Sequence, residues 1–255
     1  MKKIIYSLLF LFLFTSAEAQ ITVTEVAVLS EKVSNNAVCE GFLNDTAYLF
    51  TFGGIDTSKL YSGIHLRSYR YNTLTDSTIQ IPDLPDTLGK IAAGASRIDS
   101  IIYIAGGYYV FQNGLELSSH KMHRYNIVNN TFLSDGQDIP VATDDHVQVV
   151  YKDSLIYLIT GWSDTKNIPN VQIYNPALDS WMVGTPTPNL GFYKSFGASG
   201  SIVGDTIYYF GGASSSSGFG LQKHLIKGVI DALDPTQISW SASIPDPNIS
   251  GYRMA

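Results

Sequence analysis

The sequence has few cysteines and few charges. Cys39 is the single cysteine among 255 residues, which excludes an internal disulfide, so packing and hydrogen bonds must hold the fold together. Charged residues make up only 15% of the chain, and 22 acidic residues outnumber 16 basic ones, for a net charge of −6. A nucleic acid or an anionic membrane needs a basic face, so we expect neither as a partner.

Two catalytic or phosphate-binding motifs are also lacking. The chain contains no Gly-x-Ser-x-Gly nucleophile turn. The serine-rich segment 213–220 carries no lysine and follows an expected strand, so it does not read as a phosphate loop.

Long hydrophobic runs are confined to the N-terminus. Lys2 and Lys3 precede an apolar run over residues 4–14, and Ala17-Glu18-Ala19 follows as a small-x-small cleavage pattern. A run of this length rises only about 17 Å as a helix, against roughly 30 Å for a membrane core. The pattern therefore predicts a signal peptide over 1–19 rather than an anchor, with export to the periplasm or the cell exterior and no membrane insertion after cleavage.

A repeat dominates the remaining sequence. Four short apolar strings, rich in Ile, Tyr, Leu and Phe, each begin with Asp and end in Gly-Gly or, once, in Thr-Gly. Their last glycines recur at intervals of 51 to 54 residues, which is the period of a repeat architecture. The glycines of these anchors are Gly53, Gly54, Gly106, Gly107, Gly161, Gly211 and Gly212.

Two further sequence features recur with the same period as the glycines. Tyr71, Tyr125 and Tyr174, each followed by Asn, open the next strand of three units, and Trp181 and Trp240 follow in the third and fourth units. A proline-marked turn then closes each unit, as in Ile81-Pro82. Each unit is expected to be a β-meander whose strands and turns are marked by the same residue types.

These anchors together resemble the kelch repeat, over essentially the whole chain after residue 19. The resemblance implies an all-β, kelch-type β-propeller over 20–255, in which four-stranded blades stack around an axis because one blade cannot bury both its faces. The third unit differs from this pattern because it has Thr160-Gly161 in place of Gly-Gly, and only two units contain the tryptophan. A β-sandwich, the alternative, would not need a period of about fifty residues.

The period divides the chain into four nearly complete blades, at about 34–82, 90–140, 146–186 and 194–245. Residues 21–29 alternate as a lone strand would, and 251–255 read as the start of a further blade. We expect a monomer that is part of a larger ring, with a closed four-bladed ring as the alternative.

Function is expected at one mouth of the propeller, where the loops 55–64, 108–119, 162–170 and 213–224 gather. Basic residues near the start of each blade could form a cationic collar for an anionic ligand, and aromatic residues after the glycines could stack on a sugar or peptide. Each could instead serve a turn, an ion pair with an acid such as Asp145, or loop packing. The candidates are Lys90, His146, Lys194 and Arg253 for the collar, and Tyr108, Tyr109, Phe111 and Trp162 for stacking.

These features favour a secreted module that binds a protein or a glycan, without a cofactor or metal. The alternative is an enzyme similar to sialic acid mutarotase, also a kelch propeller, with Glu40 or Asp145 beside the collar; the sequence singles out no catalytic residue. A copper site like that of galactose oxidase is not expected, because His120 and His123 would point to opposite faces of a strand. Cys39 reads as a small buried side chain.

Overall fold

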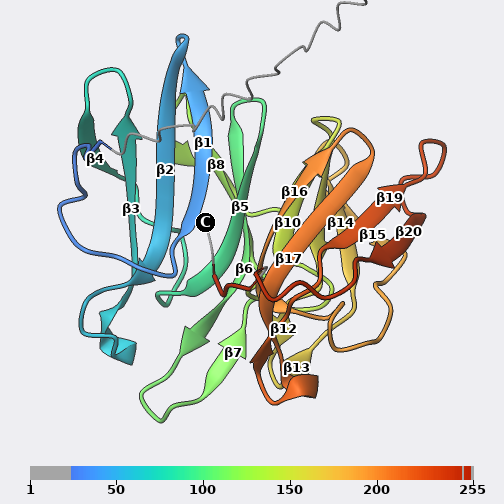
Figure 1. Cartoon of the computed structure of the whole chain (residues 1–255). Coiled ribbons are helices and arrows are strands. Elements are labelled where there is room, and N and C mark those ends of the chain that lie inside the picture. The colour runs from blue at the N-terminus through green and yellow to red at the C-terminus, as the bar shows by residue number, and fades with distance from the viewer. Residues whose placement is uncertain (1–23, 249, 254–255) are drawn as a thin grey trace, which may run out of the picture.

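The computed structural model describes residues 24–248 and 250–253, and it shows four antiparallel sheets arranged as blades (Figure 1). The predicted signal peptide at 1–19 lies outside the described residues. Within the described residues there is no α-helix, and no helix has the length and apolarity needed to cross a membrane.

Each blade is a meander of four strands in chain order, as predicted. Blade 1 contains β1 (Ala37–Leu43), β2 (Thr46–Ile55), β3 (Ile64–Asn72) and β4 (Ser77–Ile81). Blade 2 contains β5 (Ile91–Ile98), β6 (Ile101–Val110), β8 (Met122–Asn126) and β9 (Thr131–Phe132). Blade 3 contains β10 (Val147–Tyr151), β11 (Leu155–Ile159), β14 (Val171–Asn175) and β15 (Ser180–Gly184). Blade 4 contains β16 (Phe196–Val203), β17 (Thr206–Ser214), β19 (Ile226–Ile230) and β20 (Ile238–Ala242).

Short elements fill the loops that follow each glycine pair. They are the 3-10 turns η1 (Tyr61–Gly63) and η2 (Ser215–Ser217), the strands β7 (Glu116–Ser118) and β18 (Gly220–Leu221), and the hairpin of β12 (Trp162–Ser163) and β13 (Lys166–Asn167). Strands β7, β12 and β13 gather at the same end of the molecule (Figure 1). The loops predicted to share one mouth thus lie on one side.

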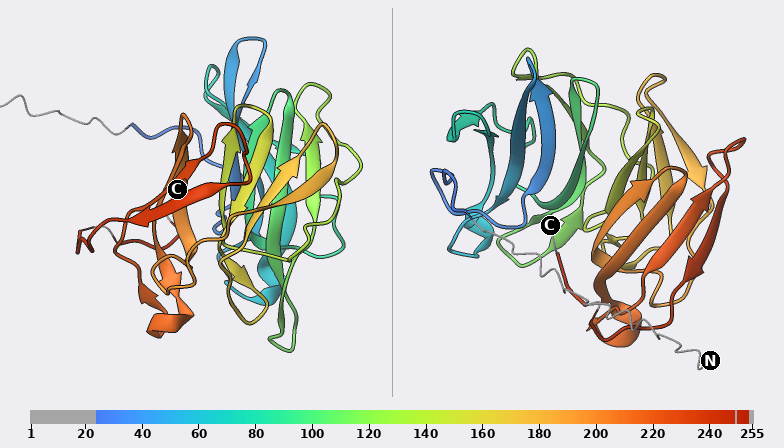
Figure 2. Two further views of the ribbon diagram at one scale, coloured as in Figure 1. Left: turned by 90° about the vertical axis from the view of Figure 1, so that its right-hand side faces the viewer. Right: turned by 45° about the horizontal axis from the view of Figure 1, so that its top comes forward.

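Stability comes from packing between blades. The described residues form three apolar cores, each between two neighbouring blades. Phe50 meets Tyr125 between blades 1 and 2, Tyr103 meets Tyr174 between blades 2 and 3, and Tyr157 shares a core with Tyr209 between blades 3 and 4. The first strands β1, β5, β10 and β16 lie next to one another in that order, and the sheets fan out from them (Figures 1 and 2). Burial on both faces explains the continuous apolar runs before the glycines.

The repeat anchors have equivalent contacts in successive blades. The hydroxyls of Tyr71, Tyr125 and Tyr174 each donate to the side chain five residues later, at Asp76, Asn130 and Asp179. The indoles of Trp181 and Trp240 donate to backbone carbonyls of Gln137 and Thr185, in the linkers that precede their blades. Cys39 is buried and free, in the core between blades 1 and 2.

The glycine pairs join each blade to the next. In the first three blades the second glycine donates its backbone N–H to a carbonyl just before the following blade: Gly54 to Lys90, Gly107 to Thr143 and Gly161 to Ser195. In blade 4, Gly212 donates in the same way to the carbonyl of Gly251, in the segment that follows the blade. The first position is left-handed in every blade, with φ between 53° and 73° for Gly53, Gly106, Thr160 and Gly211. Thr160 keeps this conformation despite its branched side chain, and its hydroxyl donates to the carbonyl of Ser195.

The two ends of the described chain differ from the sequence prediction. Residues 24–29 form no strand, since they contact blade 1 through side chains: Ala27 N–H donates to Asp76 Oδ1 at 2.7 Å, and the Thr78 hydroxyl donates to the Val28 carbonyl at 2.9 Å. The side chains of Val26 and Val28 are exposed, so the alternating apolar residues of this segment do not pack against a core. Residues 251–253, predicted to start a further blade, form a bend rather than a strand.

Candidate functional site

A chain of backbone hydrogen bonds links the starts of successive blades. Ala92 donates to the carbonyl of Asn35, Asp145 to that of Ala92, Gly197 to that of Asp145, and Arg253 to that of Gly197, at 2.8 to 2.9 Å. All five residues are left-handed, with φ between 49° and 67°. We call Asn35, Ala92, Asp145, Gly197 and Arg253 the belt. It places Arg253 and Asp145 side by side although 108 residues separate them.

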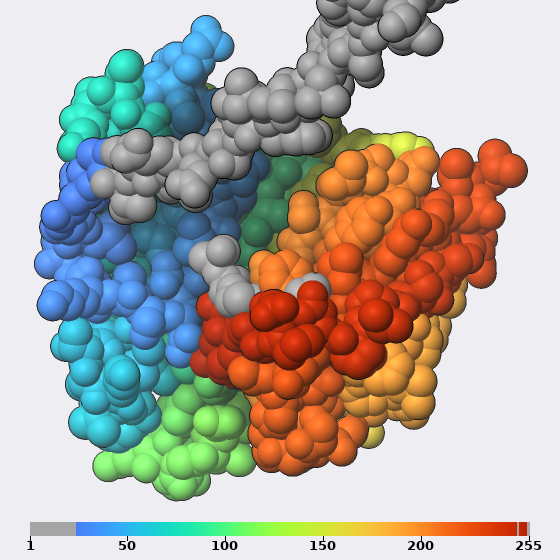
Figure 3. Space-filling model, in the orientation of Figure 1, coloured from blue at the N-terminus to red at the C-terminus, as the bar shows by residue number. Residues whose placement is uncertain are grey.

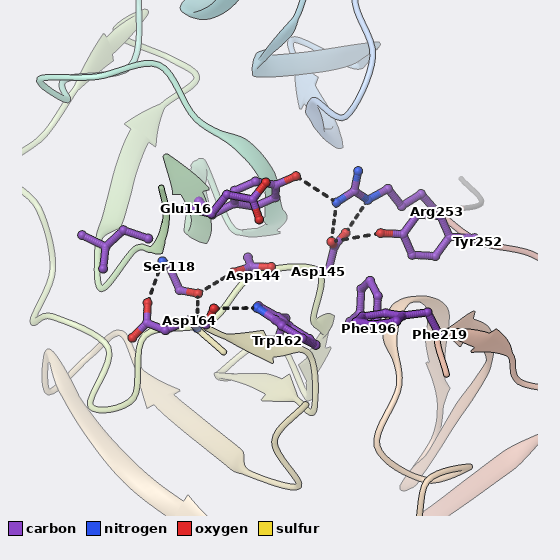
Figure 4. Close-up of a pocket in the computed structure, with 12 residues that line it drawn as sticks. Glu116, Ser118, Asp144, Asp145, Trp162, Asp164, Phe196, Phe219, Tyr252 and Arg253 are labelled. Atoms are coloured by element: carbon purple, nitrogen blue, oxygen red, sulfur yellow. Dashed lines mark hydrogen bonds and ion pairs between the residues drawn. The ribbon is translucent and has the colours of Figure 1, made fainter. Parts of the chain in front are cut away.

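A pocket of about 170 Å³ opens at the predicted mouth, next to the belt (Figure 4). Loops of blades 2, 3 and 4 and the segment before the C-terminus contribute to it. In the space-filling view, the red residues of that segment lie across the front of the molecule, against blade 4 (Figure 3). The lining residues of this mouth pocket are Tyr108, Glu116, Leu117, Ser118, Asp144, Asp145, Trp162, Asp164, Phe196, Phe219, Tyr252 and Arg253.

Aromatic rings form much of the wall. The ring of Phe196 lies 5.3 Å from that of Trp162 and 5.4 Å from that of Tyr252, each nearly edge to face. Phe219 extends the group, 6.0 Å from Trp162. Rings held in this way present flat apolar faces, which stack on sugars, planar cations or peptide side chains.

Arg253 is fixed by its neighbours within the wall. Its Nε donates to Asp145 Oδ1 at 2.7 Å, and its Nη2 donates to Asp145 Oδ2. The guanidinium also lies 5.0 Å from the ring centre of Tyr252 and 6.0 Å from that of Tyr108. The only cation of the described lining therefore has its charge balanced by a carboxylate inside the protein.

Ser118 ties two of the loops together around a buried acid. Its hydroxyl donates to Asp144 Oδ2 at 2.6 Å and accepts the backbone N–H of Asp164 at 2.8 Å, while its own N–H donates to Asp164 Oδ1 at 3.0 Å. Asp144 is only 2% exposed, and burial raises the pKa of its carboxyl to about 8. Asp144 is therefore mostly protonated at neutral pH.

Of the eight residues predicted at the mouth, the structure brings three into the pocket: Tyr108, Trp162 and Arg253. Tyr109 points instead between blades 1 and 2, where its hydroxyl donates to Asp86 Oδ2 at 2.8 Å. Phe111 lies at the turn between β6 and β7, and its backbone closes that turn with Leu115.

The other three collar candidates lie elsewhere. Lys90 is 1% exposed, with Nζ 3.0 Å from Asp86 Oδ2 and 2.7 Å from His123 Nε2. His146 lines a second cavity, which shares Asp145 and Arg253 with the mouth pocket. Its Nε2 contacts Gln148 Oε1 at 3.1 Å, and burial lowers its pKa to about 4. Lys194 follows a turn closed on Leu190 and is absent from the pocket lining.

The belt explains why these four cations do not converge. The position of Arg253 corresponds to Gly197, Asp145 and Ala92 in the preceding blades. Lys90 lies two residues before its belt position, Lys194 three before and His146 one after, so their side chains leave the backbone in different directions.

Several lining residues were not among the predicted site residues: Glu116, Ser118, Asp144, Asp164, Phe196, Phe219 and Tyr252. Asp145 was expected only as an acid beside the basic residues. Counting along the sequence does not align Arg253 with Asp145, because Asp145 lies 38 residues after Gly107 whereas Arg253 lies 41 after Gly212. The backbone hydrogen bonds of the glycines give the alignment, since each belt residue from Ala92 onward lies two residues after the carbonyl that the preceding glycine binds. Among the described residues, no group of three or more His, Cys, Asp or Glu is placed to hold a metal ion.

Comparison with known proteins agrees with this architecture. No family model matches the chain. Kelch-like protein 15 of Gallus gallus is 24% identical over 138 residues, which are 54% of this chain and 26% of that protein. The match thus spans about a quarter of the length of that curated relative. The solved structure of YjhT superposes with a TM-score of 0.66 at 16% identity, over 88% of this chain and 69% of that chain. At this identity the likeness is one of fold, and with the repeat anchors and the four blades it identifies the chain as a kelch-repeat β-propeller.

Proposed function

We propose that this propeller is an exported binding module that recognises a protein or a glycan at the mouth pocket. The observation that carries the proposal is the pocket wall itself, in which loops of three blades bring aromatic rings and carboxyl groups to one opening. Stacking rings supply contact area, and carboxyl oxygens accept hydrogen bonds from hydroxyl or N–H groups of a ligand. Export rests on the N-terminal sequence pattern alone.

The test is a binding screen of the mature chain on glycan and peptide arrays, repeated with variants. Trp162→Ala and Phe219→Ala should each weaken binding of any captured ligand by about tenfold or more, since they remove stacking faces. Phe42→Ala is a matched control, because Phe42 on β1 is 55% exposed and Phe219 is 60% exposed, but Phe42 lies outside the pocket. Binding that is unchanged in both mouth variants would contradict the proposal.

A sugar-directed enzyme of the mutarotase kind is the second candidate, and one observation favours it. Asp144, protonated at neutral pH, shares the pocket with the ion-paired Asp145. Carboxyl groups whose environments separate their pKa values can act as acid and base. Anomer interconversion followed by NMR on acidic and neutral sugars would test this activity, and it should be lost in Asp144→Asn if Asp144 supplies the acid.

A further inference from the structure

The mouth pocket already holds one guanidinium, that of Arg253. Asp145 binds it through both carboxylate oxygens, and the rings of Tyr252 and Tyr108 lie 5.0 and 6.0 Å from it. A paired carboxylate with flanking aromatic faces is a favourable environment for a planar cation. This part of the wall therefore shows how the pocket chemistry accommodates an arginine side chain on a peptide segment.

Carboxyl groups and aromatic rings also line the rest of the pocket, where no second cation is present among the described lining residues. Glu116 on β7 lines the pocket near Tyr108, Asp164 in the β12–β13 turn lies beside Trp162, and the ring of Phe219 lies 6.0 Å from that of Trp162 (Figure 4). Within residues 24–248 and 250–253, no lysine, arginine or histidine lies within ion-pair distance of either carboxylate. Asp164 keeps one oxygen for the Ser118 N–H, which leaves Oδ2 free of protein donors among the described residues.

The charges of the pocket-lining residues favour one class of ligand. Asp144 is neutral at pH 7, and Asp145 balances Arg253, so Glu116 and Asp164 are left as uncompensated negative charges. An anionic ligand would be repelled by both. A neutral ring could stack on the aromatic faces, but it would leave the two charges unused. A cation with a flat face uses both features at once.

We propose that this open wall, made of Glu116, Asp164, Trp162 and Phe219, binds the guanidinium group of an arginine side chain on a protein or peptide partner. The inference rests on the proposed function of the mouth as a binding surface and names the ligand chemistry. Arginine fits better than lysine, because its planar fork can stack on a ring while it donates to a carboxylate. A peptide is favoured over an amino sugar because the segment that carries Arg253 already places an arginine side chain in this pocket.

The test compares N-acetyl-arginine amide with N-acetyl-citrulline amide, which has nearly the same shape but no charge. Binding to the mature chain is followed by NMR or Trp fluorescence at low and high salt. The arginine compound should bind at least tenfold more tightly, N-acetyl-lysine amide should be intermediate, and added salt should reduce the difference. Equal binding of the arginine and citrulline compounds, or no binding of the arginine compound, would overturn the inference, as would glucosamine binding in its place.

Variants separate this inference from the broader function. Glu116→Gln and Asp164→Asn should each weaken the arginine compound by about threefold or more, and both residues are exposed, so the fold should be retained. Asp153→Asn removes the same charge in the exposed turn between β10 and β11, where φ is 47°, a conformation that Asn tolerates, and should leave binding unchanged. One outcome is that a neutral ligand from the array loses its binding in Trp162→Ala and keeps it in the double variant Glu116→Gln with Asp164→Asn. In that case the proposed binding function of the mouth stands and the arginine inference fails. If no ligand responds to Trp162→Ala, the proposed function itself fails.

Discussion

Arg253 donates through two nitrogens to both carboxylate oxygens of Asp145, and this ion pair joins the segment before the C-terminus to the start of blade 3. The carboxylate is nearly buried and the guanidinium partly so. Removing the arginine leaves a carboxylate without its partner in a site that water reaches poorly.

Arg253→Ala is therefore expected to lower the free energy of unfolding by about 2 kcal/mol, as lost hydrogen bonds to a charged group do. Urea denaturation measures the change, and Asp145→Asn combined with Arg253→Ala should cost less than the sum of the two single changes. Lys121→Ala is the control, because the pair of Lys121 with Asp138 is exposed, and its loss should change stability by less than about 1 kcal/mol. A strictly additive double variant would mean that the pair contributes nothing.

Asp144 makes the stability of the protein depend on pH. Burial raises its pKa in the folded state to about 8, from an ordinary value of 3.8. Between about pH 4 and pH 8 the folded state keeps a proton that the unfolded chain releases, so this group makes stability fall as pH rises through that window.

Asp144→Asn should remove this slope, because the amide stays neutral and its oxygen can still accept the Ser118 hydroxyl. The variant is expected to melt near the parent temperature at pH 4 and above it at pH 8. Thermal melts from pH 4 to pH 9 test this, with Asp153→Asn as a control that keeps the parent slope. Parallel curves for parent and Asp144→Asn would show that Asp144 ionises normally.

The repeat anchors were enough to predict most of the fold. The period predicted the start of each blade to within three residues of its first strand, because each glycine pair lies in a strand buried between blades. The tyrosines were expected to open the next strand, but Tyr71, Tyr125 and Tyr174 each lie next to last in theirs. The same anchors predicted the mouth face, and with it Tyr108, Trp162 and Arg253 in the pocket.

The detailed pairing at the mouth was beyond the sequence. Lys90 and Arg253 both lie near the start of a blade, yet an offset of two residues buries Lys90 against Asp86 and turns Arg253 toward Asp145. The offset depends on where the backbone becomes left-handed, and residues as different as Asn35, Ala92 and Gly197 adopt that conformation. Residues 24–29 alternate as a strand does, but they bond to side chains of blade 1 and form no ladder.

The buried cluster around Lys90 offers a third prediction. Lys90 and His123 both contact Asp86 Oδ2, and Tyr109 donates to the same oxygen. Lys90→Met should destabilise the protein by about 3 kcal/mol, because it leaves the nearly buried Asp86 without its lysine.

Asp86→Asn together with Lys90→Met should recover part of that loss, because no unpaired charge then stays buried. Chemical denaturation of both variants decides the matter. If the double variant is as unstable as the sum of the single changes, the loss comes from packing around the lysine stem rather than from the ion pair.

Replacing alanine by glycine is expected to change the stability in opposite directions at a belt position and at a nearby strand position. Ala92 has φ 57°, which costs an L-residue with a Cβ roughly 1 kcal/mol, whereas Ala95 lies three residues on within β5 and is not among the positive-φ residues. Ala92→Gly is therefore expected to raise the free energy of unfolding by a few tenths of a kcal/mol up to about 1 kcal/mol. Ala95→Gly should lower it by about 0.5 to 1 kcal/mol, because glycine in a strand adds backbone freedom to the unfolded chain. Urea midpoints of the two variants, measured side by side, give the signs directly. If both variants are less stable, Ala92 is not strained, and the turn itself prefers the left-handed conformation. If Ala92→Gly alone is more stable, the hydrogen bonds between blades impose this conformation on Ala92, as they do on Gly197, which has no Cβ to oppose it.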